Sequence, residues 1–288
     1  NSGTWQQLGS DIDGVSIGDE FGKAISLSSN GQIIAVGAPA NDDGGSDSGS
    51  VRIFEYTSNS WQQIGSDIDG NTTRDSLGFS VSLSDDGTIV AIGLPSLISD
   101  NPNGNSKTRI YKNNSGTWTQ IGSDINGEAA ADGSGYSVSL SSDGQVVAIG
   151  APDNDGNGNS SGHARIFQNQ NGTWTQISSD IDGSNIGDRS GFSLAISDDG
   201  STVVVGSKDA AAGGSQRGSV SVFSKDIDPR LSSSSPADNA TAVAIDSNIV
   251  LNFSEAVDAE SGNIVIYKAS DNSTVETIDV TSGQVTGS

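Results

Sequence analysis

The sequence predicts an all-β fold made of repeated four-stranded units, and three observations support this. The phrase WQQLGSDIDG at Trp5 returns in near-copies at Trp61, Trp118 and Trp174, at offsets of 56, 57 and 56 residues. Short apolar runs alternate with Gly, Ser, Asn and Asp throughout residues 1–225, which is typical of strands joined by turns. No segment of this region keeps the i, i+3, i+4, i+7 apolar spacing of an amphipathic helix.

Each repeat predicts four antiparallel strands. In the third full unit, GYSVSLS (135–141) alternates apolar residues with serine and predicts a half-buried strand. The Asp and Gly of residues 142–144 suit a two-residue hairpin, and the apolar QVVAIGAP (145–152) predicts a strand buried on both faces. HARIFQN (163–169) and the tryptophan phrase complete the unit. Four-stranded sheets that bury both faces only against their neighbours are β-propeller blades, so we expect one tryptophan per blade to fill the same slot between blades.

Four segments carry a family resemblance. FGKAISLSSNGQIIAVGAP, LGFSVSLSDDGTIVAIGLP, SGYSVSLSSDGQVVAIGAP and the degenerate SGFSLAISDDGSTVVVGSK resemble FG-GAP repeats. Such repeats form integrin-α-type propeller blades, and the W-x-Q-x-G-x-D-I-D-G form is similar to that of large bacterial surface proteins. Integrin-type blades bind calcium in a long loop between their first two strands. Here that loop is cut to SNG, DDG or SDG, so the resemblance does not place calcium there.

The last part of the chain changes composition. The Ser- and Pro-containing residues 226–236 predict a linker. In residues 237–288, AVAI, NIVLNFS, NIVIYKA and VETIDV predict short strands, and SPADNATAVAIDSNIVLNFSEAV resembles the start of bacterial Ig-like domains of the S-layer and adhesin type. A complete sandwich takes about 100 residues, so we expect a partial Ig-like β-sandwich. At the other end, the first tryptophan phrase either closes the ring on the last blade or belongs to a longer propeller.

Composition excludes several function classes. Thirteen Lys and Arg face thirty-six Asp and Glu, a formal net charge of -23, which disfavours nucleic acid and anionic lipid partners. No apolar run is long enough for membrane insertion. The chain has no Cys and one histidine, His163, which rules out thiolate and multi-His zinc sites. We expect His163 to be a surface residue at the start of a strand, because no catalytic motif adjoins it.

Acidic residues recur after each tryptophan with the spacing Asp-x-Asp/Asn-Gly-x4-Asp. The four copies are Asp11, Asp13 and Asp19; Asp67, Asp69 and Asp75; Asp124, Asn126 and Asp132; and Asp180, Asp182 and Asp188. Two interpretations stay open. The side chains cap the turn from one blade to the next, or they converge with backbone carbonyls as a hard oxygen site for Ca²⁺.

A second calcium candidate follows the third Gly-Ala-Pro. Asp153, Asp155 and Asn157 stand at alternate positions before Gly158, like the first half of an EF-hand loop. Ala164 replaces the bidentate Glu expected at the twelfth position. The alternative is a solvated hairpin tip.

These observations predict a non-enzymatic extracellular or cell-surface protein. We expect a structural or adhesive scaffold whose propeller displays loops, with calcium as its candidate ion. The expected partners are extracellular proteins or glycans, together with self-assembly. The alternative is a glycan- or protein-binding lectin-like module with its ligand on one propeller face. An extracellular hydrolase is third, since it would require acids from different blades to share one pocket.

Overall fold

The computed structural model describes residues 3–96, 106–129, 131–211, 217–225, 231–235, 250–253, 263–267 and 273–279. The chain divides into two compact units, residues 1–225 and 226–288. The described residues form strands and turns, and they include no helix that could cross a membrane. The predicted all-β fold is confirmed.

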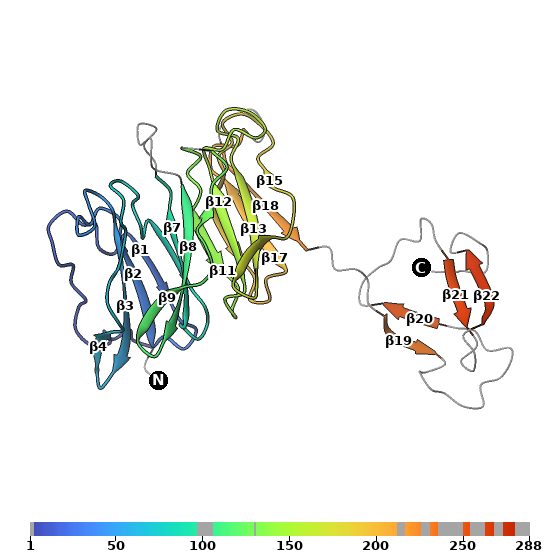
Figure 1. Cartoon of the computed structure of the whole chain (residues 1–288), viewed down its shortest axis with the longest axis horizontal. Helices are drawn as coiled ribbons and strands as arrows, with labels where there is room; N and C mark the ends of the chain where they lie inside the picture. Colours follow the sequence, from blue (N-terminus) through green and yellow to red (C-terminus); the bar gives the residue numbers. More distant parts are fainter. Residues whose placement is uncertain are drawn as a thin grey trace. The chain divides into compact units, whose positions relative to one another are not determined.

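The first unit consists of four antiparallel sheets packed face to face in a row, which we call blades 1 to 4 (Figure 1). Blade 1 contains β1 (Ala24–Leu27), β2 (Ile33–Ala38), β3 (Ser50–Thr57), β4 (Ser60–Gln63) and β5 (Ile68–Asp69). Blade 2 contains β6 (Ser80–Leu83), β7 (Ile89–Leu94), β8 (Lys107–Asn114), β9 (Thr117–Gln120) and β10 (Ile125–Asn126). Blade 3 contains β11 (Ser137–Leu140), β12 (Val146–Ala151), β13 (His163–Gln170), β14 (Thr173–Gln176) and β15 (Ile181–Asp182). Blade 4 contains β16 (Ser190–Ile196), β17 (Thr202–Ser207) and β18 (Ser219–Ser224).

The fourth strand of blades 1 to 3 is broken into two pieces. In blade 1, β4 pairs with the end of β3 and β5 pairs with its beginning, at Ser50↔Asp69. Gly65 lies between the two pieces with a φ of 75°, a backbone conformation that glycine adopts without a steric cost. The break places the recurring acids where the second piece of the fourth strand pairs with the beginning of the third strand, a region that we call the blade corner.

The turn between the first two strands differs from the prediction. Leu140 pairs with Val147, and the Ser141 hydroxyl donates to Asp143 and accepts from the Val146 N–H. The two-residue hairpin is therefore wrong, because a serine and an aspartate close a longer loop. In the matching turn of blade 4, hydrogen bonds from Ser197 and Ser201 lower the pKa of Asp199 to about 2.

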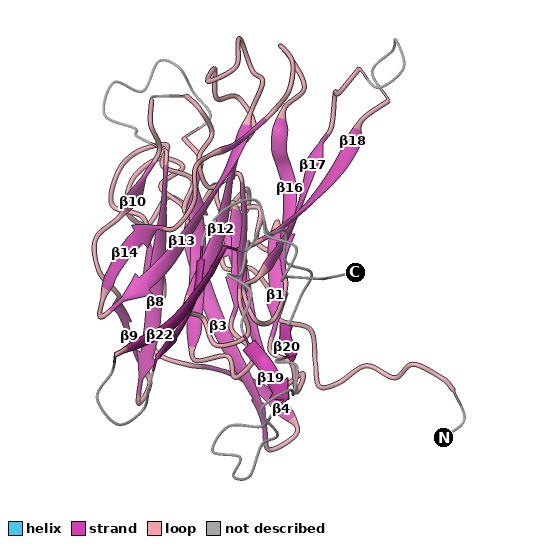
Figure 2. Cartoon of the chain, turned by 90° about the vertical axis from the view of Figure 1, so that its right-hand side faces the viewer, coloured by secondary structure: helices cyan, strands magenta, loops and turns pink. Residues whose placement is uncertain are grey.

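Neighbouring blades pack mainly through the first strand of one blade and the first two strands of the blade before it, as where β16 lies beside β12 (Figure 2). Val81 and Leu83 of β6 pack with Val51 and Ile53 of β3 in one buried cluster. Every residue of β7 is buried, as predicted for the second strand. The serines of the first strands also lie between blades: the Ser26, Ser82 and Ser139 hydroxyls each accept from a backbone N–H of the next blade, at 2.9, 3.0 and 3.1 Å.

The Phe-Gly and Gly-Ala-Pro motifs meet between blades. The glycine at the Gly-Ala-Pro position of each blade lies against the glycine at the Phe-Gly position of the next, where Leu or Ser replaces Phe. The pairs are Gly37 and Gly78, Gly93 and Gly135, and Gly150 and Gly191. A Cβ on the first member of any pair would collide with the carbonyl oxygen of the second. Backbone therefore touches backbone at this point, which explains why the repeat needs glycine in both motifs.

Two of the four tryptophans join consecutive blades. The indole N–H of Trp118 donates to the Ile64 carbonyl at 2.9 Å and that of Trp174 to Ile121 at 3.0 Å, whereas that of Trp61 donates to Leu8 of the N-terminal phrase at 2.9 Å. The predicted role between blades is confirmed for Trp118 and Trp174. Trp5 differs, because its side chain is fully exposed.

The two ends of the row expose apolar side chains that are buried elsewhere. Ile25 in β1 is 67% exposed and Val222 in β18 is 65% exposed, whereas Ile53, which corresponds to Val222 in blade 1, is 1% exposed. The N-terminal phrase contacts blade 1 through Leu8, so it does not serve here as the fourth strand of blade 4.

The second unit contains two strand pairs within its described residues. β19 (Leu231–Ser235) pairs with β20 (Val250–Phe253), and β21 (Asn263–Tyr267) pairs with β22 (Thr274–Asp279). The last three match the predicted strands, and the predicted AVAI strand lies outside the described residues. β19 lies inside the segment predicted as a linker, so those residues contribute to the second unit instead.

The close glycine contact predicts a large effect of one methyl group. Gly93→Ala should lower the free energy of unfolding by about 1–3 kcal/mol, because its Cβ would meet the Gly135 backbone, which cannot rotate away. The matched control is Gly206→Ala, whose Cβ meets only the movable Ser193 side chain within 3 Å. Differential scanning calorimetry compares the two variants, and equal losses of stability would contradict the backbone contact.

Candidate functional site

The first acid of each copy accepts a hydrogen bond from the glutamine four residues before it. The pairs are Gln7 to Asp11 at 2.8 Å, Gln63 to Asp67 at 2.6 Å, Gln120 to Asp124 at 2.8 Å, and Gln176 to Asp180 at 2.6 Å. These side chains close the break in the fourth strand. The contact is architectural, although its partner is a side chain rather than the backbone N–H of an Asx turn.

The second member of each copy lies two residues further along. The backbone carbonyls of Asp13 and Asn126 accept from Arg52 at 2.9 Å and Arg165 at 2.6 Å, both in the blade that follows. Burial, with the nearby carboxylates of Asp67 and Asp43, raises the pKa of Asp69. Asp182 occupies the same position in blade 3.

The third acid of each copy is buried and belongs to the next blade. Asp19 accepts from Asn41 and Asp132 accepts from Asn154, each at 3.0 Å. Asp188 accepts from the backbone and side chain of Asn185 at 2.9 and 3.2 Å, and Asp75 pairs with Lys107 at 3.4 Å. The three acids of one copy therefore do not converge on one point, and in no copy do all three form a metal-sized group among the described residues.

The loop after the third Gly-Ala-Pro sends its candidate ligands in different directions. Asp153 pairs with Arg189 at 3.2 Å, Asp155 accepts from the Ser160 N–H at 2.8 Å, and Asn157 donates to the Gly183 carbonyl at 3.1 Å.

The buried residue of this loop is Asn154, which the sequence argument passed over. It matches Asn41 of blade 1, since each donates to the third acid preceding its own blade and each accepts at its carbonyl from the glycine that ends its loop. The Asn-Asp pair, rather than Asp-x-Asp, fixes the shared loop conformation.

The corners of the blades differ most in the first residue of the third strand. This position holds Ser50 in blade 1, Lys107 in blade 2 and His163 in blade 3. In blade 1, which has no cation here, Asp67 and Asp69 lie together with Asp43 in an exposed group. Calcium binding there stays a prediction.

In blade 2 the corner is neutralised by the protein itself. Lys107 lies 3.4 Å from Asp75 and 3.8 Å from Asp124, and Arg109 contacts both oxygens of Asp124 at 3.0 and 3.2 Å. Burial disfavours the Asp124 carboxylate, but hydrogen bonds from Arg109 and Gln120 outweigh it and hold the pKa of Asp124 below its usual value.

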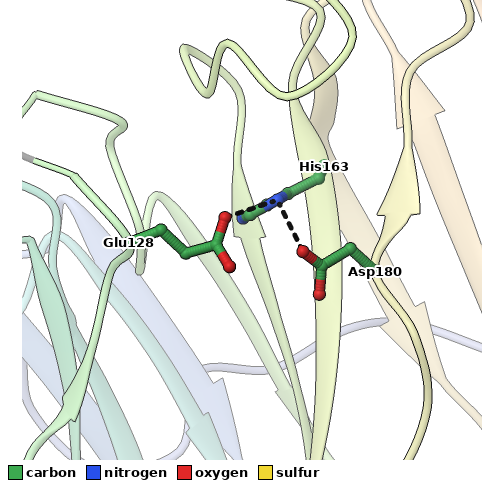
Figure 3. Close-up of side chains that lie close together, drawn as sticks. All are labelled: Glu128, His163 and Asp180. Atoms are coloured by element: carbon green, nitrogen blue, oxygen red, sulfur yellow. Dashed lines mark ion pairs between the residues drawn. The ribbon is translucent and has the colours of Figure 1, made fainter.

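In blade 3 the corner residue is the only histidine of the chain (Figure 3). The expectation of a surface histidine is wrong, because His163 is 1% exposed and its side chain faces Glu128 on the preceding connection. Its Nδ1 atom faces Glu128, Asp180 and Asp182 at 3.8–3.9 Å. Glu128 lies outside the repeated spacing, so the sequence pattern gave no reason to select it.

Removing the cation of blade 2 tests how much the corner contributes. Lys107→Met should cost about 3–5 kcal/mol of unfolding free energy, since it leaves Asp75 buried with no hydrogen bond to either carboxylate oxygen. Adding Asp75→Asn should recover part of that loss. Denaturant unfolding measures both, with Lys23→Met as control because its partner Glu20 is exposed. A loss under about 1 kcal/mol for Lys107→Met would contradict the corner's role.

Comparisons with known proteins agree with this architecture. The FG-GAP repeat model matches residues 12–54, and the bacterial Ig-like domain model matches residues 225–286. No curated protein matches the sequence.

Solved structures share only distant similarity with the chain. A candidate 6-phosphogluconolactonase from Bacteroides uniformis is 12% identical with a TM-score of 0.49, over 89% of this chain and 71% of that one. Hydrazine synthase of Kuenenia stuttgartiensis is 14% identical with a TM-score of 0.43, over 71% and 58%. Neither likeness supports a statement about activity. The family matches describe the chain better: it carries an FG-GAP repeat and, after it, a bacterial Ig-like domain.

Proposed function

We propose that this protein is a non-enzymatic adhesion scaffold on the outside of a bacterial cell. The observation that carries the proposal is the pairing of an FG-GAP repeat with a bacterial Ig-like domain, two domain types that typically occur in extracellular or surface proteins. In this role the propeller unit displays loops, and the Ig-like unit acts as a spacer. The expected partners are extracellular proteins or glycans.

The contacts that the recurring acids make support a scaffold role. Most of them accept hydrogen bonds from glutamine or asparagine, or pair with lysine or arginine, at the contacts between blades. These contacts give the acids a part in holding the propeller unit together. The loop at residues 152–162 carries exposed side chains, including Asp155 and Asn159, which are available to a partner.

One observation favours the lectin-like alternative. A cleft of about 260 Å³ lies between the broken fourth strand of blade 2 and the β13–β14 hairpin of blade 3, and Trp174, Phe167 and Asn126 line it. An aromatic face beside polar groups is suited to a sugar ring. Binding of a glycan in this cleft would still be a non-enzymatic activity.

A binding assay with the full chain tests the proposal. Beads coated with the protein should be retained on arrays of extracellular-matrix proteins or glycans, and combined substitution of Asp155 and Asn159 by alanine should reduce retention at least about threefold, without changing the melting temperature. Loss with Trp174→Ala instead would favour the cleft. Absence of retention on either array, or turnover of glycoside or ester substrates by the chain, would contradict an adhesion scaffold.

A further inference from the structure

Three carboxylates surround one buried nitrogen atom at the corner of blade 3. The Nδ1 atom of His163 lies 3.9 Å from Glu128 Oε2, 3.8 Å from Asp180 Oδ2 and 3.9 Å from Asp182 Oδ1. The Nδ1, Glu128 and Asp180 ligand atoms all lie within 4.8 Å of one another. Figure 3 shows the imidazole and the carboxylates of Glu128 and Asp180 pointing toward a common centre.

The buried nitrogen has no hydrogen-bond partner. A donor and acceptor 3.8 Å apart do not form a hydrogen bond, so a proton on Nδ1 reaches none of the three carboxylates directly. Without that proton, the Nδ1 lone pair faces three negative groups. Either state leaves a buried polar atom unsatisfied, and such an atom calls for a ligand between it and the carboxylates.

Blade 2 shows what the corner requires. The same position there is Lys107, whose ammonium group lies between Asp75 and Asp124. Blade 3 places an imidazole where blade 2 places an ammonium group. The acids are nevertheless retained, and Glu128 is added.

Neighbouring protein groups leave the inward-facing oxygens largely available. Gln176 donates to Asp180 Oδ1, which leaves Oδ2 for another ligand. Arg165 lies 3.8 Å from Glu128 Oε1, and Asn154 donates one long hydrogen bond of 3.4 Å to Glu128 Oε2, an oxygen that can accept a second partner. The side chains of Glu128 and Asp182 are 46% and 34% exposed, so an ion can enter from the solvent side.

We propose that Glu128, His163 and Asp180 bind a first-row divalent metal ion of the Zn²⁺ class, with Asp182 or water as the fourth ligand. Neighbouring ligand atoms of tetrahedral Zn²⁺ lie about 3.3–3.6 Å apart, since its bonds to N and O measure about 2.0–2.2 Å. The distances of 3.8–3.9 Å from His163 Nδ1 to the carboxylate oxygens exceed this by a few tenths of an ångström. The nitrogen ligand disfavours Ca²⁺, which takes oxygen ligands.

The ion would tie two blades together. Glu128 lies on the connection from blade 2 to blade 3, and His163 and Asp180 belong to blade 3. The bound ion would therefore fix this connection to blade 3. Lys107 does the same in blade 2, where it pairs with Asp75 on the connection from blade 1. This role is independent of the proposed adhesion function.

Because the chain has one histidine, nitrogen NMR of the full chain, made without a histidine tag, reports on this site alone. Titration with Zn²⁺ at pH 7.5 should saturate at one equivalent and shift the Nδ1 resonance. Glu128→Gln should weaken Zn²⁺ binding at least about tenfold in calorimetry. His163→Lys, which copies the corner of blade 2, should abolish binding at this site and keep the fold. Asp67→Asn, in the exposed acidic group of blade 1, is the matched control and should leave Zn²⁺ affinity unchanged.

Several results would overturn the proposal. The first is no saturable binding at about 100 µM Zn²⁺, which is roughly a hundredfold above a dissociation constant of about 1 µM. The second is a shift at Nε2 rather than at Nδ1. The third is equal affinity in the native chain, Glu128→Gln and His163→Lys. Binding of Ca²⁺ as tightly as Zn²⁺ would also reject the assignment of a nitrogen ligand. If His163→Lys fails to fold, the Glu128→Gln result decides, because Glu128 is half-exposed and tolerates the change.

Discussion

The close approach of backbone to backbone between consecutive blades is the constraint on which the rest of the propeller unit depends. At Gly37 and Gly78, and at the two equivalent pairs, there is no room for a Cβ atom. This contact sets the spacing between sheets. The spacing in turn lets Val81 and Leu83 reach the preceding blade, and it brings the Ser26 hydroxyl within hydrogen-bond distance of the next strand. The tryptophan hydrogen bonds hold the opposite ends of the sheets at the same separation.

This packing creates an electrostatic problem at the blade corners. Each break in the fourth strand needs a short acceptor, and the connection to the next blade needs another, so carboxylates accumulate where one blade follows another. Buried or crowded carboxylates require compensation. Blade 2 provides it with Lys107 and Arg109, whereas blade 1 exposes its acids to solvent. Blade 3 retains the acids around a buried histidine whose Nδ1 atom has no hydrogen-bond partner.

Much of the fold could be predicted from the sequence, because the period of the repeat and the alternation of apolar and polar residues are local signals. The strands of the third unit, the burial of residues 146–151 and the tryptophan contacts were all predictable. The four-residue turn closed by Ser141 and Asp143 was not, since Asp and Gly suit more than one hairpin type. The broken fourth strand depends on which parts of β3 remain unpaired, and this is a tertiary property.

The candidate site was harder to predict, because its members come from different blades. The spacing within one copy suggested that Asp67, Asp69 and Asp75 act together. In the structure, Asp75 instead lies beside Lys107 of the next blade, which also pairs with Asp124. Glu128 and His163 are single residues outside any motif, and only their common position at the corner connects them.

The central claim is that the acids at the corners of blades 2 and 3 need positive charge and that blade 3 obtains it from a metal ion. Anomalous diffraction at the zinc edge, from crystals of the full chain grown with Zn²⁺, tests it directly. The account predicts a peak between His163 Nδ1 and the carboxylates of Glu128 and Asp180, and none beside Lys107. A peak confined to the exposed acids of blade 1, or an empty blade 3 corner in which His163 bonds directly to a carboxylate, would contradict it.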